Sequence, residues 1–337
     1  MSKFINRVGG IKFVLPFILG GAFLLTLPVY AGQYYMHILL MVFLNIVLAL
    51  SYRIFFIAGM GSFGHGAFYC IGAYISALFA TRLGLPFPAS FLAGGVGAGI
   101  SGAGLALISR RSKGAYFFLI SFAFWAIVYT VAKQWPAVTG GMKGIGGIPP
   151  ITGCGSLTSY YYMALLFAGV SIFIMYLIDR SRFGHELIAI GDDDDLAEVI
   201  GIDMSRYKIL AFAIGTLFAG FAGSFFVHYA GYVHPSMFPL WLNCYIILFV
   251  VVGGARKLWG PIAGAISLTL TAEILRGTEA LQQILLGAIL VGVILGMPNG
   301  IAGLVDNWRA RRTPKQRAEV VDSERSDLLK RFFGLRR

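Results

Sequence analysis

A glycine-rich apolar stretch contains the residues best suited to contact a polar solute. The sequence AGMGSFGHGAFYCIGAY starts at Ala58 and places Ser62 and His65 among closely spaced glycines. Each glycine weakens a helix by about 1 kcal/mol relative to alanine, so we expect a broken helix here. Unwound backbone inside a membrane is tolerated where it is buried in protein or lines a cavity, and half-helix ends there can meet charged groups. The alternative is that the glycines only allow close helix packing.

Other residues capable of chemistry do not form a recognisable set. The remaining histidines fall in different segments, and no spacing links a nucleophile to a base or several metal ligands. Four consecutive aspartates, residues 192–195, could hold a divalent cation loosely, but neighbouring helical residues point in different directions. The three cysteines are too far apart to predict a disulfide framework or a zinc site. We therefore expect no metal site, no catalytic residue and no enzymatic activity on this chain.

Two further absences in the sequence concern energy coupling. The sequence contains no G-x-x-x-x-G-K-[ST] phosphate loop, so the chain is not expected to bind ATP in that way. Proton or sodium coupling usually requires carboxylates within the membrane, and only Glu273, near the end of an apolar run, qualifies. An ion-coupled secondary transporter therefore remains only as an alternative function.

The composition predicts a protein embedded in lipid. Apolar and aromatic residues make up 58% of the 337 residues, and charged residues only 12%, about half their usual share in soluble domains. All 15 Asp and Glu residues lie at or after Asp179. The net charge of +12 comes from short basic clusters between apolar runs and from the C-terminal tail, so we expect membrane lipid and no nucleic acid as a partner.

Apolar runs of about 20 residues, the length that crosses a hydrocarbon core, predict an all-α polytopic membrane protein with about ten transmembrane helices. The expected spans are Phe13–Tyr30, Tyr34–Tyr52, Ile54–Ala80, Pro88–Ser109, Gly114–Ala132, Tyr160–Ile178, Tyr207–Ala230, Trp241–Ala255, Gly260–Leu275 and Leu281–Leu304. The first span also suits a cleavable signal peptide. We expect it to be retained, because the second span follows almost at once.

The distribution of Lys and Arg predicts the orientation. With the N-terminus in the cytoplasm, 23 basic residues lie on the cytoplasmic side and 4 on the other side. Positive residues concentrate in cytoplasmic loops, so both termini are expected to be cytoplasmic. Residues 1–305 then form the transmembrane domain, and residues 306–337 form a basic, partly disordered cytoplasmic tail.

Small residues at helical spacing predict where helices pack against each other. Gly95 and Gly99 stand four residues apart, and Gly215, Ala219 and Gly223 share one side of another span. Lipid tails provide no hydrophobic drive between helices, so contacts in membranes use small residues that allow close approach. We interpret these positions as packing surfaces of a helical bundle.

The outer hydrophilic loop, between the fifth and sixth spans, is long and rich in glycine and proline. It contains VTGGMKGIGGIPPITG, starting at Val138. A docking surface, an outer gate and a passive connection are all compatible with this composition.

The inner hydrophilic loop, from Asp179 to Arg206, holds eight of the 15 acidic residues. Asp192 is expected to cap a short amphipathic helix under the membrane that ends near Gly201. Its apolar side would carry Leu196, Val199 and Ile200. The alternative is a solvated loop.

Five blocks of the sequence, in order, resemble one known family. They are GSFGHGAF..IGAY, VTGGMKGIGGIP, FGHELIAIGDDDDLAEVIGIDMSRYKILAF, GGARKLWGPIAGA and GMPNGIAGL. They are similar to signatures of the membrane permease of branched-chain amino acid ABC transporters, the longer of the two permeases. The resemblance covers roughly residues 40 to 305.

The resemblance implies a multi-pass permease subunit of an importer in the bacterial inner membrane. Its implied partners are a second homologous permease, two cytoplasmic ATPases that bind ATP and Mg²⁺, and a periplasmic or tethered binding protein. The implied ATPase-coupling residues are Phe183, Gly184, Ala189, Ile190, Asp192, Ala197, Glu198 and Gly201. The candidates for the substrate pathway are Gly59, Gly61, Ser62, Gly64, His65, Thr139, Gly140 and Gly141.

Three positions depart from the family pattern. Gly191 stands where the family usually has arginine, and Asp195 stands where it has an apolar residue. Both changes make the expected ATPase contact more acidic. Lys143 replaces a usual asparagine in the outer loop, so the substrates considered include urea, amides and other small acids besides branched-chain amino acids.

Overall fold

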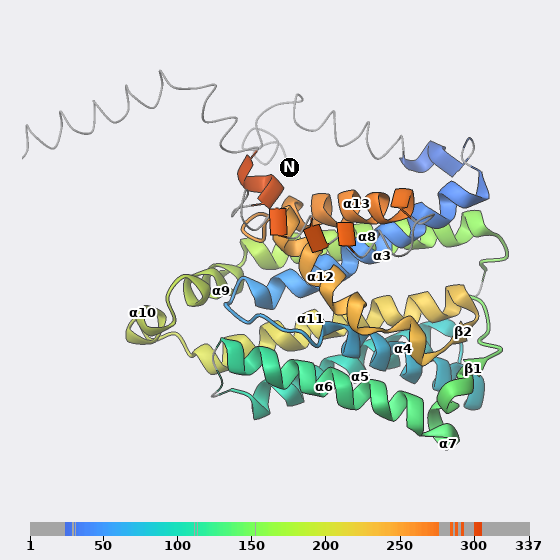
Figure 1. The fold of residues 1–337 in the computed structure, drawn as a ribbon, viewed down its shortest axis with the longest axis horizontal. Helices are drawn as coiled ribbons and strands as arrows, with labels where there is room; N and C mark the ends of the chain where they lie inside the picture. Colours follow the sequence, from blue (N-terminus) through green and yellow to red (C-terminus); the bar gives the residue numbers. More distant parts are fainter. Residues whose placement is uncertain are drawn as a thin grey trace, which may run out of the picture.

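The computed structural model is a bundle of long helices with one small two-stranded sheet (Figure 1). It describes residues 24–28, 30, 32–110, 112, 114–151, 153–275, 284–285, 287–288, 291–292 and 300–304. The first and last expected spans and the basic tail lie largely or wholly outside these described residues.

The described elements follow one another in the order given by their labels. The α-helices are α3 (Gln33–Phe56), α4 (His65–Arg82), α5 (Phe87–Ile108), α6 (Ala115–Gln134), α7 (Pro136–Thr139), α8 (Leu157–Arg180), α9 (Arg182–Asp192), α10 (Asp194–Val199), α11 (Met204–Ala230), α12 (Leu240–Gly253) and α13 (Trp259–Ile274). Short 3-10 helices are η1 (Gly141–Lys143) and η2 (Pro235–Met237). Strands β1 (Ile145–Gly146) and β2 (Tyr232–Val233) pair antiparallel.

The long helices confirm an all-α polytopic membrane protein. Within the described residues, six segments are long and apolar enough to cross a membrane. They are Gln33–Phe56, Phe87–Ile108, Ala115–Gln134, Leu157–Arg180, Met204–Ala230 and Pro235–Gly253. The limits of these helices agree with the sequence prediction within a few residues, because uninterrupted apolar runs set them.

The predicted span Ile54–Ala80 is wrong in its limits and correct in being broken. Its first residues belong to α3, which continues to Phe56, and α4 begins only at His65. Gly59 has a φ of 76°, a left-handed conformation that ends α3 and that glycine adopts without strain. The chain between the two helices, residues 57–64, is non-helical, and we call it the break segment.

Small residues bring α4, α5 and α11 into backbone contact, as their spacing predicted. A Cβ atom on Gly72 would overlap the backbone of Gly220, and one on Gly223 would overlap the carbonyl oxygen of Tyr69. A Cβ on Gly95 would overlap the ring of Phe221. These three helices therefore form the most closely packed part of the bundle, where van der Waals contact provides the attraction.

The two ends of the bundle carry different structures (Figure 1). Helices α9 and α10 lie at one end, together with the break segment's first residues and the ends of α3 and α8. The small sheet and α7 lie at the other end. The loops predicted to be cytoplasmic thus gather at the α9–α10 end, and the loop predicted to be outside lies opposite to them.

The contact between Gly72 and Gly220 leads to a stability prediction. Gly72→Ala should destabilise the folded protein by about 1–3 kcal/mol, because an added methyl group must force two backbones apart. Thermal unfolding in detergent measures the effect. The control is Gly104→Ala on α5, where no atom lies within 4 Å of the new Cβ. Equal unfolding temperatures for the two variants would contradict the packing argument.

The charge distribution and the two distinct ends lead to a topology prediction. In a chain without its native cysteines, a cysteine at Ser156 should react with an impermeant thiol reagent from outside. A cysteine at Ser181 should react only after the membrane is opened. Cys154 is removed because it lies in the same outer loop, although burial raises the pKa of its thiol. The opposite labelling pattern would show that the orientation is inverted.

Candidate functional site

The break segment is held by side chains from several helices. The backbone N–H of Phe63 donates to Ser121 Oγ on α6 at 2.8 Å, and that of Ser62 donates to the Tyr52 hydroxyl on α3 at 3.2 Å. The Gly66 N–H, in the first turn of α4, donates to Asn243 Oδ1 on α12 at 2.7 Å. Backbone donors released by the break therefore find partners inside the protein, as a membrane interior requires.

His65 begins α4 and is only 1% exposed. Its Nε2 lies 2.8 Å from Ser51 Oγ, and the Ser51 hydroxyl is 2.8 Å from the Leu48 carbonyl oxygen. The hydroxyl has one hydrogen, which is directed at Leu48, so His65 Nε2 must carry the hydrogen that Ser51 Oγ accepts. The Nδ1 atom is then an unprotonated acceptor, and it has no partner among the described residues.

Asn243 is a functional candidate that the sequence reasoning missed. It is 1% exposed, and its Nδ2 has no hydrogen-bond partner among the described residues. A buried amide that lacks a partner is costly, so such a residue is a reason to look for a role. The sequence feature that could have identified Asn243 is its position as a single amide within the apolar run LWLNCYIILFVVVG. The start of α4 thus combines a free acceptor on His65 with free donors on Asn243.

The other predicted residues of the break segment have different surroundings. Ser62 and Gly64 are buried, and a Cβ on Gly64 would overlap the carbonyl oxygen of Ser121. Gly61 has no atom within 4 Å of a Cβ position. Gly59 and its neighbour line a cavity of about 40 Å³ at the α9–α10 end, whose lining also includes Arg110, Ser109, Asp194 and Lys208.

The outer-loop candidates lie at the opposite end of the bundle. Thr139 is the last residue of α7, and its Oγ1 is 2.8 Å from both the Ala132 and the Trp135 carbonyl oxygens. Gly140 and Gly141 both have positive φ, at 74° and 55°. The structure therefore does not bring these three residues together with His65, and the predicted pathway residues form two separate groups.

The described residues of the outer loop are bonded to the segment around the end of α11. Ile145 pairs with Val233 across the small sheet, and the Ile148 N–H donates to the Gly231 carbonyl oxygen at 3.1 Å. His228, 1% exposed on α11, has Nδ1 at 2.8 Å from the Pro149 carbonyl oxygen. These bonds attach the loop to both ends of the turn that follows α11.

The inner loop contains two helices. The sequence predicted one helix, capped by Asp192, but Asp192 is the last residue of α9 and Asp193 caps α10. Asp193 Oδ1 accepts from the N–H groups of Asp195 and Leu196 at 3.1 and 3.0 Å. The predicted cap is one residue early, because each of the four aspartates could serve and only the backbone geometry selects one. Gly201, with a φ of 88°, ends the second helix as predicted.

Helix α10 presents an uncovered apolar face. Leu196, Val199 and Ile200, the residues predicted for the apolar side of a short amphipathic helix, are 59%, 82% and 66% exposed. Only Ala197 of this helix is buried, and Glu198 is exposed beside it. Exposed apolar clusters with polar borders are typical of protein interaction surfaces.

Helix α9 is packed against the ends of α8 and α11. The Ser181 side chain caps it by accepting from the Gly184 N–H at 3.3 Å, and Gly184 contacts the backbone of α8 at Ile178. The ring of Phe183 stacks on Tyr207 with 5.5 Å between centroids. Ile190 is buried and Ala189 is half-buried, so the predicted coupling residues of α9 mainly attach it to the bundle.

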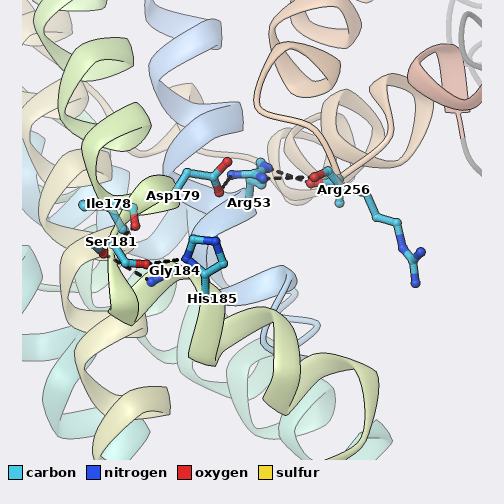
Figure 2. A network of polar contacts seen from close by, with 8 residues as sticks. Arg53, Ile178, Asp179, Ser181, Gly184, His185 and Arg256 are labelled. Atoms are coloured by element: carbon cyan, nitrogen blue, oxygen red, sulfur yellow. Dashed lines mark hydrogen bonds and ion pairs between the residues drawn. The ribbon is translucent and has the colours of Figure 1, made fainter. Parts of the chain in front are cut away.

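A buried arginine joins the ends of three segments (Figure 2). The side chain of Arg53 on α3 is 4% exposed and lies 2.8 Å from Asp179 Oδ1 on α8. Its Nε donates to the Ala255 carbonyl oxygen at 2.6 Å, and its Nη2 lies 3.4 Å from the Arg256 carbonyl oxygen. We call this group the Arg53 clamp. The sequence reasoning had assigned Arg53 to a cytoplasmic loop and predicted no partner for it.

Two more ion pairs connect the inner loop to the bundle. Arg256 Nη2 lies 3.2 Å from Asp192 Oδ1 at the end of α9. Lys208 Nζ on α11 lies 2.8 Å from both carboxylate oxygens of Asp194 on α10. The first pair is exposed and therefore contributes little stability, whereas the second is partly buried. Both nonetheless define where α9 and α10 lie.

The described residues contain no group of three His, Cys, Asp or Glu side chains placed to hold a metal ion. Glu273, the carboxylate considered for ion coupling, accepts a hydrogen bond from the Tyr34 hydroxyl at 2.6 Å near the C-terminal end of α13.

Comparison with known proteins agrees with this architecture. The family described as branched-chain amino acid transport system / permease component matches residues 34–294. The high-affinity branched-chain amino acid transport system permease protein LivM of Escherichia coli (strain K12) is 28% identical over 347 residues, covering 89% of this chain and 80% of that protein. Its counterpart in Salmonella typhimurium is 27% identical over 340 residues, with the same coverage.

A second kind of permease matches a shorter part of the chain. The permease protein LivH of the same Escherichia coli transport system is 30% identical over 146 residues, covering 42% of this chain and 44% of that protein. The family match extends from α3 through α13 and includes both the break segment and the inner loop. This chain therefore belongs to the family of branched-chain amino acid transport system permease components.

Proposed function

We propose that this chain is the membrane permease subunit of an ABC importer for branched-chain amino acids or a related small polar solute. Two cytoplasmic ATPase subunits would bind ATP and Mg²⁺ and drive the cycle. A periplasmic or tethered binding protein would deliver the solute at the end of the bundle that carries the small sheet. The proposed location is the bacterial inner membrane.

The observation that carries this proposal is the exposed face of α10. Leu196, Val199 and Ile200 remain uncovered in the single chain, and carboxylates border them. Family membership makes an ATPase the expected occupant of such a surface. The absence of a phosphate loop from the sequence is consistent with ATP hydrolysis on separate subunits.

A second permease is the other expected membrane partner. The chain matches both LivM and LivH, which are permease proteins of one named transport system. A homologous second permease would therefore complete the translocation unit. Whether this partner is a homologue or a second copy can be read from the composition of the purified complex.

The proposed route for the solute passes the start of α4. His65 Nδ1 offers an acceptor and Asn243 Nδ2 offers donors, and neither has a partner among the described residues. The start of a helix also has a positive dipole end. A small solute with both donor and acceptor groups, such as a zwitterionic amino acid, complements this combination.

An ion-coupled secondary transporter is the alternative. It would require a titrating carboxylate on the route, and the described carboxylates do not suit that role well. Asp179 is paired with Arg53, and Glu273 is bonded to Tyr34 near the C-terminal end of α13. Neither lies beside His65.

The first functional prediction is that the chain alone transports nothing. Reconstituted in liposomes by itself, it should neither hydrolyse ATP nor accumulate a branched-chain amino acid on a proton or sodium gradient. The complex purified with its ATPases and second permease should accumulate solute when ATP and loaded binding protein are supplied. Gradient-driven uptake by the single chain would favour the alternative function.

The second functional prediction concerns α10. Gly201→Val should force a left-handed backbone onto a branched residue, at a cost of roughly 1–3 kcal/mol, and displace the helix. Glu198→Lys should reverse a charge on the exposed surface. Both variants should insert normally but retain fewer ATPase subunits, or show less hydrolysis stimulated by loaded binding protein.

Matched controls separate local strain and charge from general damage. Gly201→Asn should behave like the parent, since asparagine tolerates the left-handed region and a Cβ at this position meets no atom within 4 Å. Glu198→Gln removes the charge without reversing it. Full assembly and stimulation of the Gly201→Val and Glu198→Lys complexes would show that α10 is only a solvated connection.

A further inference from the structure

The last turn of α9 touches the backbone of the break segment. A Cβ atom built on Gly191 would overlap the carbonyl oxygen of Ile57, and it would lie 3.3 Å from the Gly59 nitrogen. The contact is between two backbones, so no flexible side chain can move aside to make room. Only glycine at position 191 allows α9 to approach this closely.

The residues that Gly191 touches belong to the capped end of α3. The Ile57 N–H donates to the Arg53 carbonyl oxygen at 3.0 Å, and the Met60 N–H donates to the Phe55 carbonyl oxygen at 3.1 Å. Residues 57–60 thus continue α3 as a closed turn. A displacement of α9 toward Ile57 would act on the end of α3 directly.

The Arg53 clamp ties the same end of α3 to α8 and to the turn before α13. Through Asp179 it joins α8, from which α9 continues after Ser181. Through Ala255 and Arg256 it joins the turn whose Arg256 side chain pairs with Asp192. Figure 2 shows how the Arg53 clamp links the end of α3 to the end of α8 and to this turn, close to the start of α9. The Arg256–Asp192 pair adds a link from the same turn to the last residue of α9.

The next part of the chain, residues 61–64, is held differently. Its N–H groups at Ser62 and Phe63 donate to the hydroxyls of Tyr52 and Ser121, and Gly61 has open space around it. Hydrogen bonds from backbone N–H groups to side-chain hydroxyls can break and re-form without unfolding a helix. On the other side, Gly72 of α4 is packed directly on Gly220 of α11, which restrains α4.

We propose that the Gly191–Ile57 contact and the Arg53 clamp transmit movement of α9 to the break segment, where residues 61–64 flex next to His65. Gly191 and Arg53 are positioning residues in this proposal, since they act through their contacts with Ile57, Asp179 and Ala255. The inference rests on the proposed function, because it takes the ATPases as the source of the movement. It adds the physical connection between the ATPase surface and the start of α4.

Gly191→Ala in the assembled complex tests the proposal. The added methyl group should push the two backbones roughly 1.4 Å apart, to an ordinary carbon–oxygen contact. ATPase retention and basal hydrolysis are measured in the same complex, because Gly191 is exposed on the side away from Ile57, in the loop expected to meet an ATPase. Solute uptake per ATP hydrolysed should fall roughly tenfold, since changes along a coupled network shift the coupling between sites by about that factor. The control is Gly169→Ala on α8, where a Cβ meets nothing within 4 Å.

A reporter on the break segment provides a second measurement. Gly61→Cys, in a complex whose permease lacks its native cysteines, should be alkylated by a small thiol reagent at a rate that changes when ATP is added and loaded binding protein is present. With Gly191→Ala added, this ATP-dependent change should disappear while hydrolysis continues. If Gly191 only stabilised the fold, the variant would lose hydrolysis together with the ATP-dependent change in labelling.

Several outcomes would overturn the proposal. Parent-like uptake per ATP in the Gly191→Ala complex would do so, and so would loss of ATPase binding, which would make Gly191 part of the docking surface. If Gly191→Ala fails to insert, the Gly61→Cys reporter decides: an unchanged labelling rate during active uptake rejects the inference. Absence of ATP-driven uptake by the parent complex would reject the proposed function instead.

Discussion

Backbone groups that leave a helix inside a membrane must find partners within the protein, and this requirement shapes the region between α3 and α4. The N–H groups freed at the break are accepted by Tyr52 of α3, Ser121 of α6 and Asn243 of α12. One interruption therefore gathers three helices around the start of α4. The same requirement explains why each of these mainly apolar helices carries a hydroxyl or an amide beside the break.

Close packing of glycines fixes the other side of α4. Contacts such as Gly72 with Gly220 leave no room for a methyl group, so α4, α5 and α11 are restrained relative to one another. The break segment, in contrast, is attached by side-chain hydrogen bonds and contains Gly61 in open space. The break segment can therefore change its conformation by replacing its hydrogen bonds, while the packed helices α4, α5 and α11 keep their contacts.

Local patterns predicted what depends on local sequence, and they failed where distant residues decide the structure. Apolar run lengths located most of the long helices, and repeated glycine located the break. Arg53 and Asp179 are 126 residues apart, and Gly66 and Asn243 are 177 apart, so no periodicity could pair them. The sequence analysis did not predict helix α9, because its polar residues are typical of a loop. Tertiary contacts of the glycines at positions 184 and 191 hold this helix in place.

Acidic residues occur only from Asp179 onward, and several of them have structural roles at the α9–α10 end. Basic residues lie near this end of the bundle, and three of them are paired with acids of the inner loop or its start. The pairs are Arg53 with Asp179, Arg256 with Asp192 and Lys208 with Asp194. Asp179 and Asp194 are partly buried against the bundle, whereas Asp192 is exposed. Asp193, Asp195 and Glu198 stay on the exposed side, next to the apolar residues of α10. The exposed surface of α10 is consequently apolar at its centre and acidic at its border, which favours a partner with basic residues around an apolar groove.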